Sequence, residues 1–346
     1  MTFRFDEIGD RLRAYRIGSG LSADEIANEL GISRTALYRF EKGELAKIET
    51  LDKLAELLGV SIPTLLGVGI EYIPSAVSYF ERVRQCEETA EHIVVLAGPI
   101  SFLLASDSFL PTLRDVLNEN ICKNTSGRSK ALGDIRKIID ILQSRKSSYR
   151  ERRPHVVNLI SAFEIERFLH HGFVGRAGLT DSVLIERKAL ARREIEHFAN
   201  LIEEQPMGVQ VGIVLDTLPH TGFQLIRQPS RRCLVLSPFR LGGEPNVSVG
   251  VAMITSAPDA IALHEKAVTE MWARALKGPA ALACIRQLLD NASVGKIVDF
   301  ENFQQVSING PDDARHLTVR PKRLQQTSRA KSALSTTPKG ARRPLD

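Results

Sequence analysis

The stretch Ala23–Phe40, ADEIANELGISRTALYRF, has apolar residues at the spacing of two short helices. These apolar positions are Ile26, Leu30, Leu37 and Phe40. Gly31 can take the left-handed backbone conformation of a helix end, and Ser33 can cap the helix that follows. Ala27 is small enough to let the second helix cross close by. The stretch therefore predicts two short helices joined by a tight turn.

The second predicted helix carries polar residues of the kind that contact DNA. Two helices joined by a tight turn are typical of a helix-turn-helix, whose second helix enters the major groove. There an arginine can donate two hydrogen bonds to O6 and N7 of guanine. The candidates at this helix are Ser33, Arg34, Thr35, Tyr38 and Arg39. Lys42 and Lys47 follow it and can hold phosphates. The alternative is that Arg34 and Arg39 only solvate an exposed helix.

Helical spacing on both sides of this stretch predicts three more short helices. The first spans Glu7–Arg16, another spans Thr50–Leu58, and the last runs from a cap at Ser61 to Leu66. Ser22 and Glu25 fit a capping box, which places the start of the intervening helix near residue 23. Residues 1–70 are therefore predicted to form one all-α unit of five helices.

Two segments of this unit carry a family resemblance. They read LRAYRIGSGLSADEIANELGISRTALYRFEKG over residues 12–43 and TLDKLAELLGVSIPTLL over residues 50–66. In this order they resemble the phage-repressor-like, or xenobiotic-response-element, helix-turn-helix family. The resemblance covers about residues 7–67. It implies a lambda-repressor-like fold, double-stranded DNA as the partner, and a homodimer, because relatives usually bind two half-sites.

The resemblance also implies roles for individual residues. Arg16 and Glu41 match positions that form an ion pair, so the loss of one member should destabilise the unit. The positions that match DNA contacts are Arg34, Thr35 and Arg39 for bases, and Lys42 and the Gly43 backbone for phosphate. Ala23 stands where the family often has a glutamine that donates to a phosphate. That contact is therefore expected to be lost or moved to Ser22.

The positive charge of the chain is concentrated near its C-terminus. The net charge is +5, but residues 311–346 contain nine Lys/Arg against three Asp/Glu. Residues 1–70 contain nine Lys/Arg against eleven Asp/Glu. Any attraction to DNA must therefore come from local patches. Residues 305–346 are rich in Pro, Ser, Thr, Arg and Lys and are predicted to be a disordered basic tail.

Cysteine usage and the apolar runs indicate a cytoplasmic protein. Cys86, Cys122, Cys233 and Cys284 are far apart and lack metal-ligand spacing, so they are expected to be reduced. The longest apolar run, at 93–105, is interrupted by glycine and proline and is too short to span a bilayer. The first residues mix acids and bases and do not resemble a signal peptide. No membrane partner is expected.

The chain beyond the five helices predicts a second domain of the α+β or α/β class, with a sheet flanked by helices. Residues 67–74 are a plausible boundary, residues 71–90 are expected to form a connecting helix, and the domain is expected to span residues 91–295. Its β-rich runs are 93–96, 156–160, 209–215, 222–227, 232–236 and 247–254. The plan resembles the ligand-sensing regions of bacterial one-component regulators. The domain is therefore expected to sense a ligand or to hold a dimer together.

The second domain shows neither a catalytic set nor metal-ligand spacing, so no enzyme activity, metal or cofactor is expected. Its best candidates for a small-molecule effector are His220, Gln224 and Arg240. Arg240 stands beside two glycines and can bind an anion through its guanidinium and nearby backbone N–H groups. The alternative is an ordinary charged hairpin surface. For the whole chain, the alternative to a ligand-sensing regulator is an antitoxin-like DNA-binding protein whose C-terminal domain binds another protein.

Overall fold

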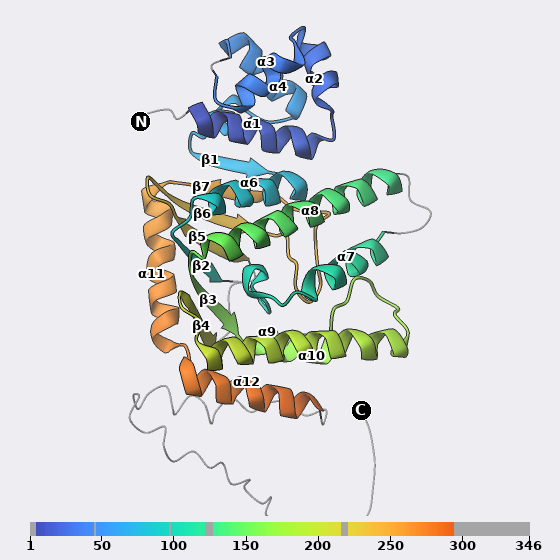
Figure 1. Ribbon diagram of the computed structural model, residues 1–346, viewed down its shortest axis with the longest axis vertical. Helices are drawn as coiled ribbons and strands as arrows, with labels where there is room; N and C mark the ends of the chain where they lie inside the picture. The colour runs from blue at the N-terminus through green and yellow to red at the C-terminus, as the bar shows by residue number, and fades with distance from the viewer. Residues whose placement is uncertain (1–4, 45, 97, 122–126, 216–220, 294–346) are drawn as a thin grey trace, which may run out of the picture.

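The computed structural model describes residues 5–44, 46–96, 98–121, 127–215 and 221–293. Figure 1 shows a small helical unit at one end and a sheet with helices on both faces beneath it. This arrangement confirms the predicted fold class, a helical unit followed by a mixed sheet with flanking helices. Cys122 and the predicted tail at 305–346 lie outside the described residues.

The helical unit contains the five expected helices. They are α1 (Phe5–Ser19), α2 (Ala23–Leu30), α3 (Arg34–Glu41), α4 (Ile48–Leu58) and α5 (Ile62–Leu66). Its small core is built from residues of α1 to α4, namely Leu12, Ala23, Ile26, Leu37 and Leu54. The apolar spacing that predicted these helices therefore also gives the face that each of them buries.

Caps fix the start of α2 and both ends of the turn that joins α2 to α3. The hydroxyl of Ser22 accepts a hydrogen bond from the Glu25 amide at 3.1 Å, and the Glu25 carboxylate accepts one from the Ser22 amide at 2.7 Å. Gly31 has φ 66° at the end of α2, a conformation that costs a glycine little. The Ser33 hydroxyl then accepts from the Ala36 amide at 3.1 Å and starts α3.

The sheet has seven strands in the order β1-β7-β6-β5-β2-β3-β4. Their bounds are β1 Ile70–Ile73, β2 His92–Leu96, β3 His155–Ser161, β4 Val209–Val214, β5 Gly222–Arg227, β6 Arg232–Ser237 and β7 Ala252–Thr255. Strands β2, β3 and β4 are parallel, and the other pairings are antiparallel. In β2, Leu96 lies opposite Leu159 of β3 and Phe223 of β5.

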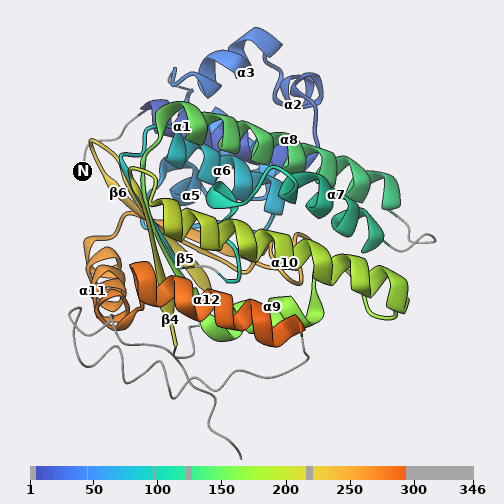
Figure 2. The same cartoon turned by 60° about the horizontal axis from the view of Figure 1, so that its bottom comes forward.

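The alternation of side chains along the strands separates two apolar layers. Ile93 and Val95 belong to the large core, whereas Val94 and Leu96 belong to a smaller core on the other face. The large core is covered by α6 (Ala76–Glu88), α7 (Phe109–Glu119), α8 (Arg128–Arg152), α9 (Ala162–His171), α10 (Asp181–Glu204) and α12 (Gly278–Ser293). A short 3-10 helix, η1 (Phe102–Leu104), packs with them. Helix α11 (Pro258–Arg274) covers the smaller core (Figure 2). None of the described helices is long and apolar enough to cross a membrane.

Residues 70–73 depart from the predicted layout. They were expected to belong to a boundary and a connecting helix, but they form β1, which pairs with β7 at the edge of the sheet. The expected helix is present as α6, and nearly all of it is buried. The strand was not predicted because the four residues between Gly69 and Pro74 are too few to show the alternation of a strand. Its partner strand also lies about 180 residues further along the chain.

A buried cluster of charges joins the helical unit to the sheet. The Arg82 guanidinium of α6 donates to both carboxylate oxygens of Glu71 in β1, at 2.7 and 3.1 Å. From α1, Arg11 donates to the same carboxylate at 3.3 Å, and Tyr15 does so at 3.0 Å. Burial alone would raise the pKa of Glu71, but the two guanidinium groups and the hydrogen bonds outweigh it and lower the pKa. The first helix is therefore held by the Glu71 carboxylate of β1, which Arg82 of α6 binds as well.

Candidate nucleic-acid interface

Helix α3 lies at the end of the molecule away from the sheet. Figures 1 and 2 show α2 and α3 beyond α1, with no element of the sheet region drawn over them. The side chains of Arg34 and Arg39 are 57% and 62% exposed. The other predicted DNA-contacting side chains that are exposed are Ser33, Thr35, Lys42 and Lys47, while Tyr38 and Gly43 are half-buried. The surface of α3 is thus open to a macromolecule.

The two arginines of α3 are paired with acids of their own unit. Arg34 donates to Asp24 of α2 at 3.2 Å and to the hydroxyl of Tyr38 at 3.1 and 3.3 Å. Arg39 donates to Glu44 at 2.7 Å. The hydrogen bond to Tyr38 and the charge of Asp24 raise the pKa of Arg34, and Glu44 raises that of Arg39. Exposed pairs of this kind are weak, so a guanine edge or a phosphate can compete for either guanidinium.

Helix α3 is held on α1 by one ion pair and one close approach. Arg16 donates to both carboxylate oxygens of Glu41, the residues that the family resemblance pairs. The Arg16 guanidinium also lies 5.8 Å from the centre of the Tyr38 ring. At Gly9, a Cβ atom would lie 2.6 Å from the backbone carbonyl oxygen of Glu41. The end of α3 therefore sits directly against the backbone of α1.

Small residues also allow the tight turn before α3. Ala27 is buried in α2, and its carbonyl oxygen accepts a hydrogen bond from the Ile32 amide at 2.9 Å, just after Gly31. The predicted phosphate contacts lie at helix ends. Lys42 caps the C-terminal end of α3, and Lys47 precedes α4. The amide of Ser22 is taken by Glu25, so only the hydroxyl proton of Ser22 can donate to a phosphate in place of the missing glutamine.

The candidate effector residues lie far from α3. Gln224, on β5, and Arg240, after β6, line the same cavity beside the sheet, so the structure brings these two together. His220 lies outside the described residues. No group of three metal-ligating side chains occurs in the described part of the chain. Among the four cysteines, Cys86, Cys233 and Cys284 are described, and each is free and buried.

Two features of this region were not predicted from the sequence. The partners of the arginines, Asp24 and Glu44, carry no signal beyond their charge, because acids near basic residues are common on any surface. The buried hydrogen bonds of Arg11 and Tyr15 in α1 to Glu71 join residues that are 60 and 56 positions apart, and no local spacing reveals such a contact.

Comparison with known proteins matches the N-terminal part of the chain. The helix-turn-helix family is matched over residues 12–65. A protein of Pyrobaculum aerophilum named as an HTH-type transcriptional regulatory protein is 40% identical over 55 residues, which are 16% of this chain and 22% of that protein. The cryptic phage CTXphi transcriptional repressor RstR of Vibrio cholerae is 35% identical over 57 residues, which are 16% of this chain and 51% of the repressor.

The chain thus spans about a fifth of one of these relatives and about half of the other. Residues 12–65 form a helix-turn-helix domain, and the predicted resemblance to phage-repressor-like regulators is confirmed. The matches do not extend to the sheet and its helices.

Proposed function

We propose, from the helix-turn-helix domain at residues 12–65, that this protein is a sequence-specific DNA-binding transcriptional regulator. The observation that carries the proposal is α3, an exposed helix with two arginines on a unit similar to those of transcriptional regulators. The proposed place of action is the cytoplasm, because a bacterial-type regulator meets its DNA there.

In the proposed complex, α3 lies in the major groove. Arg34 and Arg39 leave their exposed acids and donate to guanine edges, while Lys42 and Lys47 hold phosphates on either side. Specificity then rests on few side chains, since residues 1–70 are not basic overall. The carboxylates of Asp24 and Glu44 must then turn away from the DNA phosphates, or their charges must be neutralised by cations from the solution.

The proposed functional unit is a homodimer. One helix-turn-helix domain contacts too little DNA for tight specific binding, and a two-fold axis would place two copies of α3 on half-sites about 34–36 Å apart. Each copy of α3 is exposed at the end of its subunit, as such a dimer requires.

The proposed role of the sheet domain is to sense a small molecule rather than only to hold the dimer. The support for this choice is the cavity of about 260 Å³ beside the sheet, which a domain used only for dimerisation does not need. The cavity contains both described members of the predicted effector site, Gln224 and Arg240.

Selection of duplexes from a random library with the full-length protein tests the proposal. The selected duplex is then titrated by fluorescence anisotropy with the wild type and with the Arg34→Ala, Arg39→Ala double variant. We expect specific affinity to fall by about 10- to 100-fold, because each arginine supplies base contacts. The matched control is Arg114→Ala with Arg286→Ala, which removes two exposed charges from the sheet domain. Selection of no preferred sequence, or equal losses in both variants, would refute the proposed readout.

A further inference from the structure

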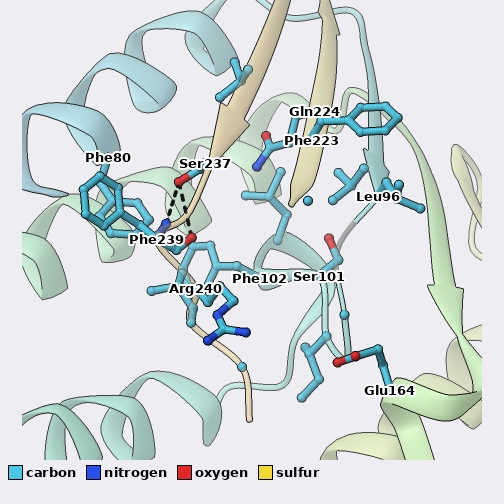
Figure 3. Close-up of a pocket in the computed structure, with 18 of the residues that line it drawn as sticks. Phe80, Leu96, Ser101, Phe102, Glu164, Phe223, Gln224, Ser237, Phe239 and Arg240 are labelled. Atoms are coloured by element: carbon cyan, nitrogen blue, oxygen red, sulfur yellow. Dashed lines mark hydrogen bonds between the residues drawn. The ribbon is translucent and has the colours of Figure 1, made fainter. Parts of the chain in front are cut away.

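The cavity beside the sheet lies at the carboxyl ends of parallel strands β2 and β3. In open sheets with parallel strands, this edge is where loops most often form ligand sites. Its walls combine residues that are far apart in the chain, from α6, β2, the start of α9, β5 and the segment after β6. Figure 3 shows Phe80, Phe102 and Phe239 around the cavity, whereas the Phe223 ring turns to the other face of the sheet, 4.9 Å from the His264 ring. The walls therefore combine aromatic rings with polar and charged groups.

The charged groups of the lining cancel one another except at one position. Arg145 donates to Glu87 at 2.7 and 2.8 Å, and both are buried. Arg167 donates to Glu164 at 3.0 Å at the mouth. Arg240 is exposed, and its guanidinium has no ion-pair partner among the described residues. One positive charge of the lining is thus available to a ligand.

The backbone of Arg240 is fixed although its side chain is free to bind. Its amide donates to the carbonyl oxygen of Asn246 at 3.0 Å, and the Asn246 amide donates back at 2.9 Å. Just before it, the Ser237 hydroxyl accepts from the Phe239 amide at 2.9 Å and holds the bend (Figure 3). A fixed backbone reduces the entropy that an arginine loses when it binds an anion.

A second polar group lies away from Arg240. The side-chain oxygen of Gln224 is buried and has no hydrogen-bond partner among the described residues. In Figure 3 Gln224 lies at the upper end of the cavity, and Arg240 lies lower, on the side of Glu164. A buried amide oxygen without a partner is costly, so a ligand that donates a hydrogen bond there gains affinity.

The size of the cavity limits the ligand. Its volume is about 260 Å³. An apolar cavity of about 150 Å³ is enough to hold benzene. The space therefore fits one ring with a few further heavy atoms. Aromatic walls favour an aromatic ring, because ring edges and faces attract one another.

We propose that this cavity binds a monocyclic aromatic carboxylic acid. The ring lies among the phenylalanines, the carboxylate accepts two hydrogen bonds from Arg240, and a hydroxyl at the far side of the ring donates to Gln224. This ligand supplies one negative charge for the one uncompensated positive charge, and its polar groups lie at Arg240 and at the unpartnered oxygen of Gln224.

The cavity and the helix-turn-helix unit share α6. On one side α6 gives Tyr79, Phe80 and Glu87 to the cavity. On another side its Arg82 binds Glu71 beside α1, and its Gln85 donates to the carbonyl oxygen of Asp10 in α1 at 3.0 Å. A ligand that shifts α6 therefore acts on the base of the DNA-binding unit. This effector role rests on the proposed function, whereas ligand binding itself does not.

Calorimetric titration of the full-length protein, without DNA, tests the binding site. The probes are benzoate, 4-hydroxybenzoate, phenylacetate and 4-hydroxyphenylacetate, with 4-hydroxybenzamide as the uncharged counterpart and inorganic phosphate as the anion without a ring. We expect at least one of these acids to bind, and the amide to bind about tenfold or more weakly, because it cannot form the charge-assisted pair. Arg240→Gln should weaken the acid by about tenfold or more. The matched control Arg232→Gln, an exposed arginine of β6 that pairs with Glu265 outside the cavity, should not.

Gln224→Leu separates the two polar contacts. It should reduce the affinity of the hydroxylated acid to that of the acid without the hydroxyl, and leave the latter unchanged. The proposal is overturned if none of the acids binds below about 10 mM, if the amide or phosphate binds as well as the acids, or if Arg240→Gln has no effect. Because these titrations contain no DNA, their failure leaves the DNA-binding proposal standing, and the loss of DNA binding in the α3 variant leaves these titrations unaffected.

Discussion

Replacing Glu71 by glutamine tests whether buried charges hold the DNA-binding unit on the sheet domain. The carboxylate is 4% exposed and accepts four hydrogen bonds, two from Arg82 and one each from Arg11 and Tyr15. Glutamine keeps the shape of the side chain, but it removes the charge and presents an NH₂ group to one of the guanidinium groups. Arg82 then remains buried without its counter-charge, whereas Arg11 keeps its ion pair with Glu7 at 3.3 Å.

The expected loss of stability is large. Removing one partner from a buried ion pair typically costs about 3–5 kcal/mol, since the remaining charge has no compensation. A direct estimate agrees, because two charges about 4 Å apart attract by about 4 kcal/mol at an effective dielectric constant of 20. We therefore expect Glu71→Gln to lower the free energy of unfolding by about 3–5 kcal/mol.

Urea unfolding at pH 7, followed by circular dichroism, measures this loss. Hydrogen exchange should also rise in α1, β1 and α6, which meet at Glu71. The matched control is Glu88→Gln at the exposed end of α6, where the carboxylate is 56% exposed and pairs with Arg84. That change should cost less than about 1 kcal/mol. A loss below about 1 kcal/mol for Glu71→Gln would refute the reasoning, since the carboxylate would then not be needed by its arginines.

The same cluster gives a pH dependence. The folded protein lowers the pKa of Glu71, so the stabilisation is fully present above the ordinary value of 4.5 and is lost as the pH falls through the lower folded value. The difference in unfolding free energy between the wild type and Glu71→Gln should be constant from pH 7 to about 5 and shrink in more acidic solution. A difference that grows below pH 5 would contradict the direction of the shift.

Two further predictions concern the DNA-binding unit. Gly9→Ala should lower the free energy of unfolding by about 1–3 kcal/mol, because the new Cβ atom would meet the Glu41 backbone. The control Gly133→Ala has open space around it in α8 and should raise the free energy of unfolding by about 0.5–1 kcal/mol. Equal effects of the two variants in urea unfolding would contradict the close approach at Gly9. Glu44→Gln should raise affinity for the selected duplex by at most about fivefold, because it releases Arg39 from a weak exposed pair. Anisotropy titrations that show weaker binding would mean that Glu44 orients Arg39 for DNA.

Much of the fold follows from local patterns. The five helices of the N-terminal unit and their caps at Ser22 and Ser33 were predicted, because apolar spacing and capping residues act within a few positions. Strands β2 to β6 were also found as β-rich runs. The order of the strands, the existence of β1 and the late start of β7 at Ala252 were not predicted, since they depend on pairing between distant residues.

The candidate sites divide in the same way. Arg34 and Arg39 of α3 were predicted from spacing and resemblance, and the structure places their side chains at the surface. Gln224 and Arg240 were chosen because polar residues gather in that loop-rich stretch. The walls of their cavity were not predicted, since phenylalanines such as Phe80 on α6 and Phe239 after β6 look like ordinary core residues in the sequence.

Genome-wide binding in cells tests most directly the central claim, that α3 reads DNA sequence. The wild-type protein should occupy a limited set of sites that share one sequence motif. The Arg34→Ala, Arg39→Ala variant, produced at the same level, should lose these sites and keep at most a weak, sequence-independent signal. Occupancy of the same sites by the double variant would contradict the account, because the base contacts would then come from other residues.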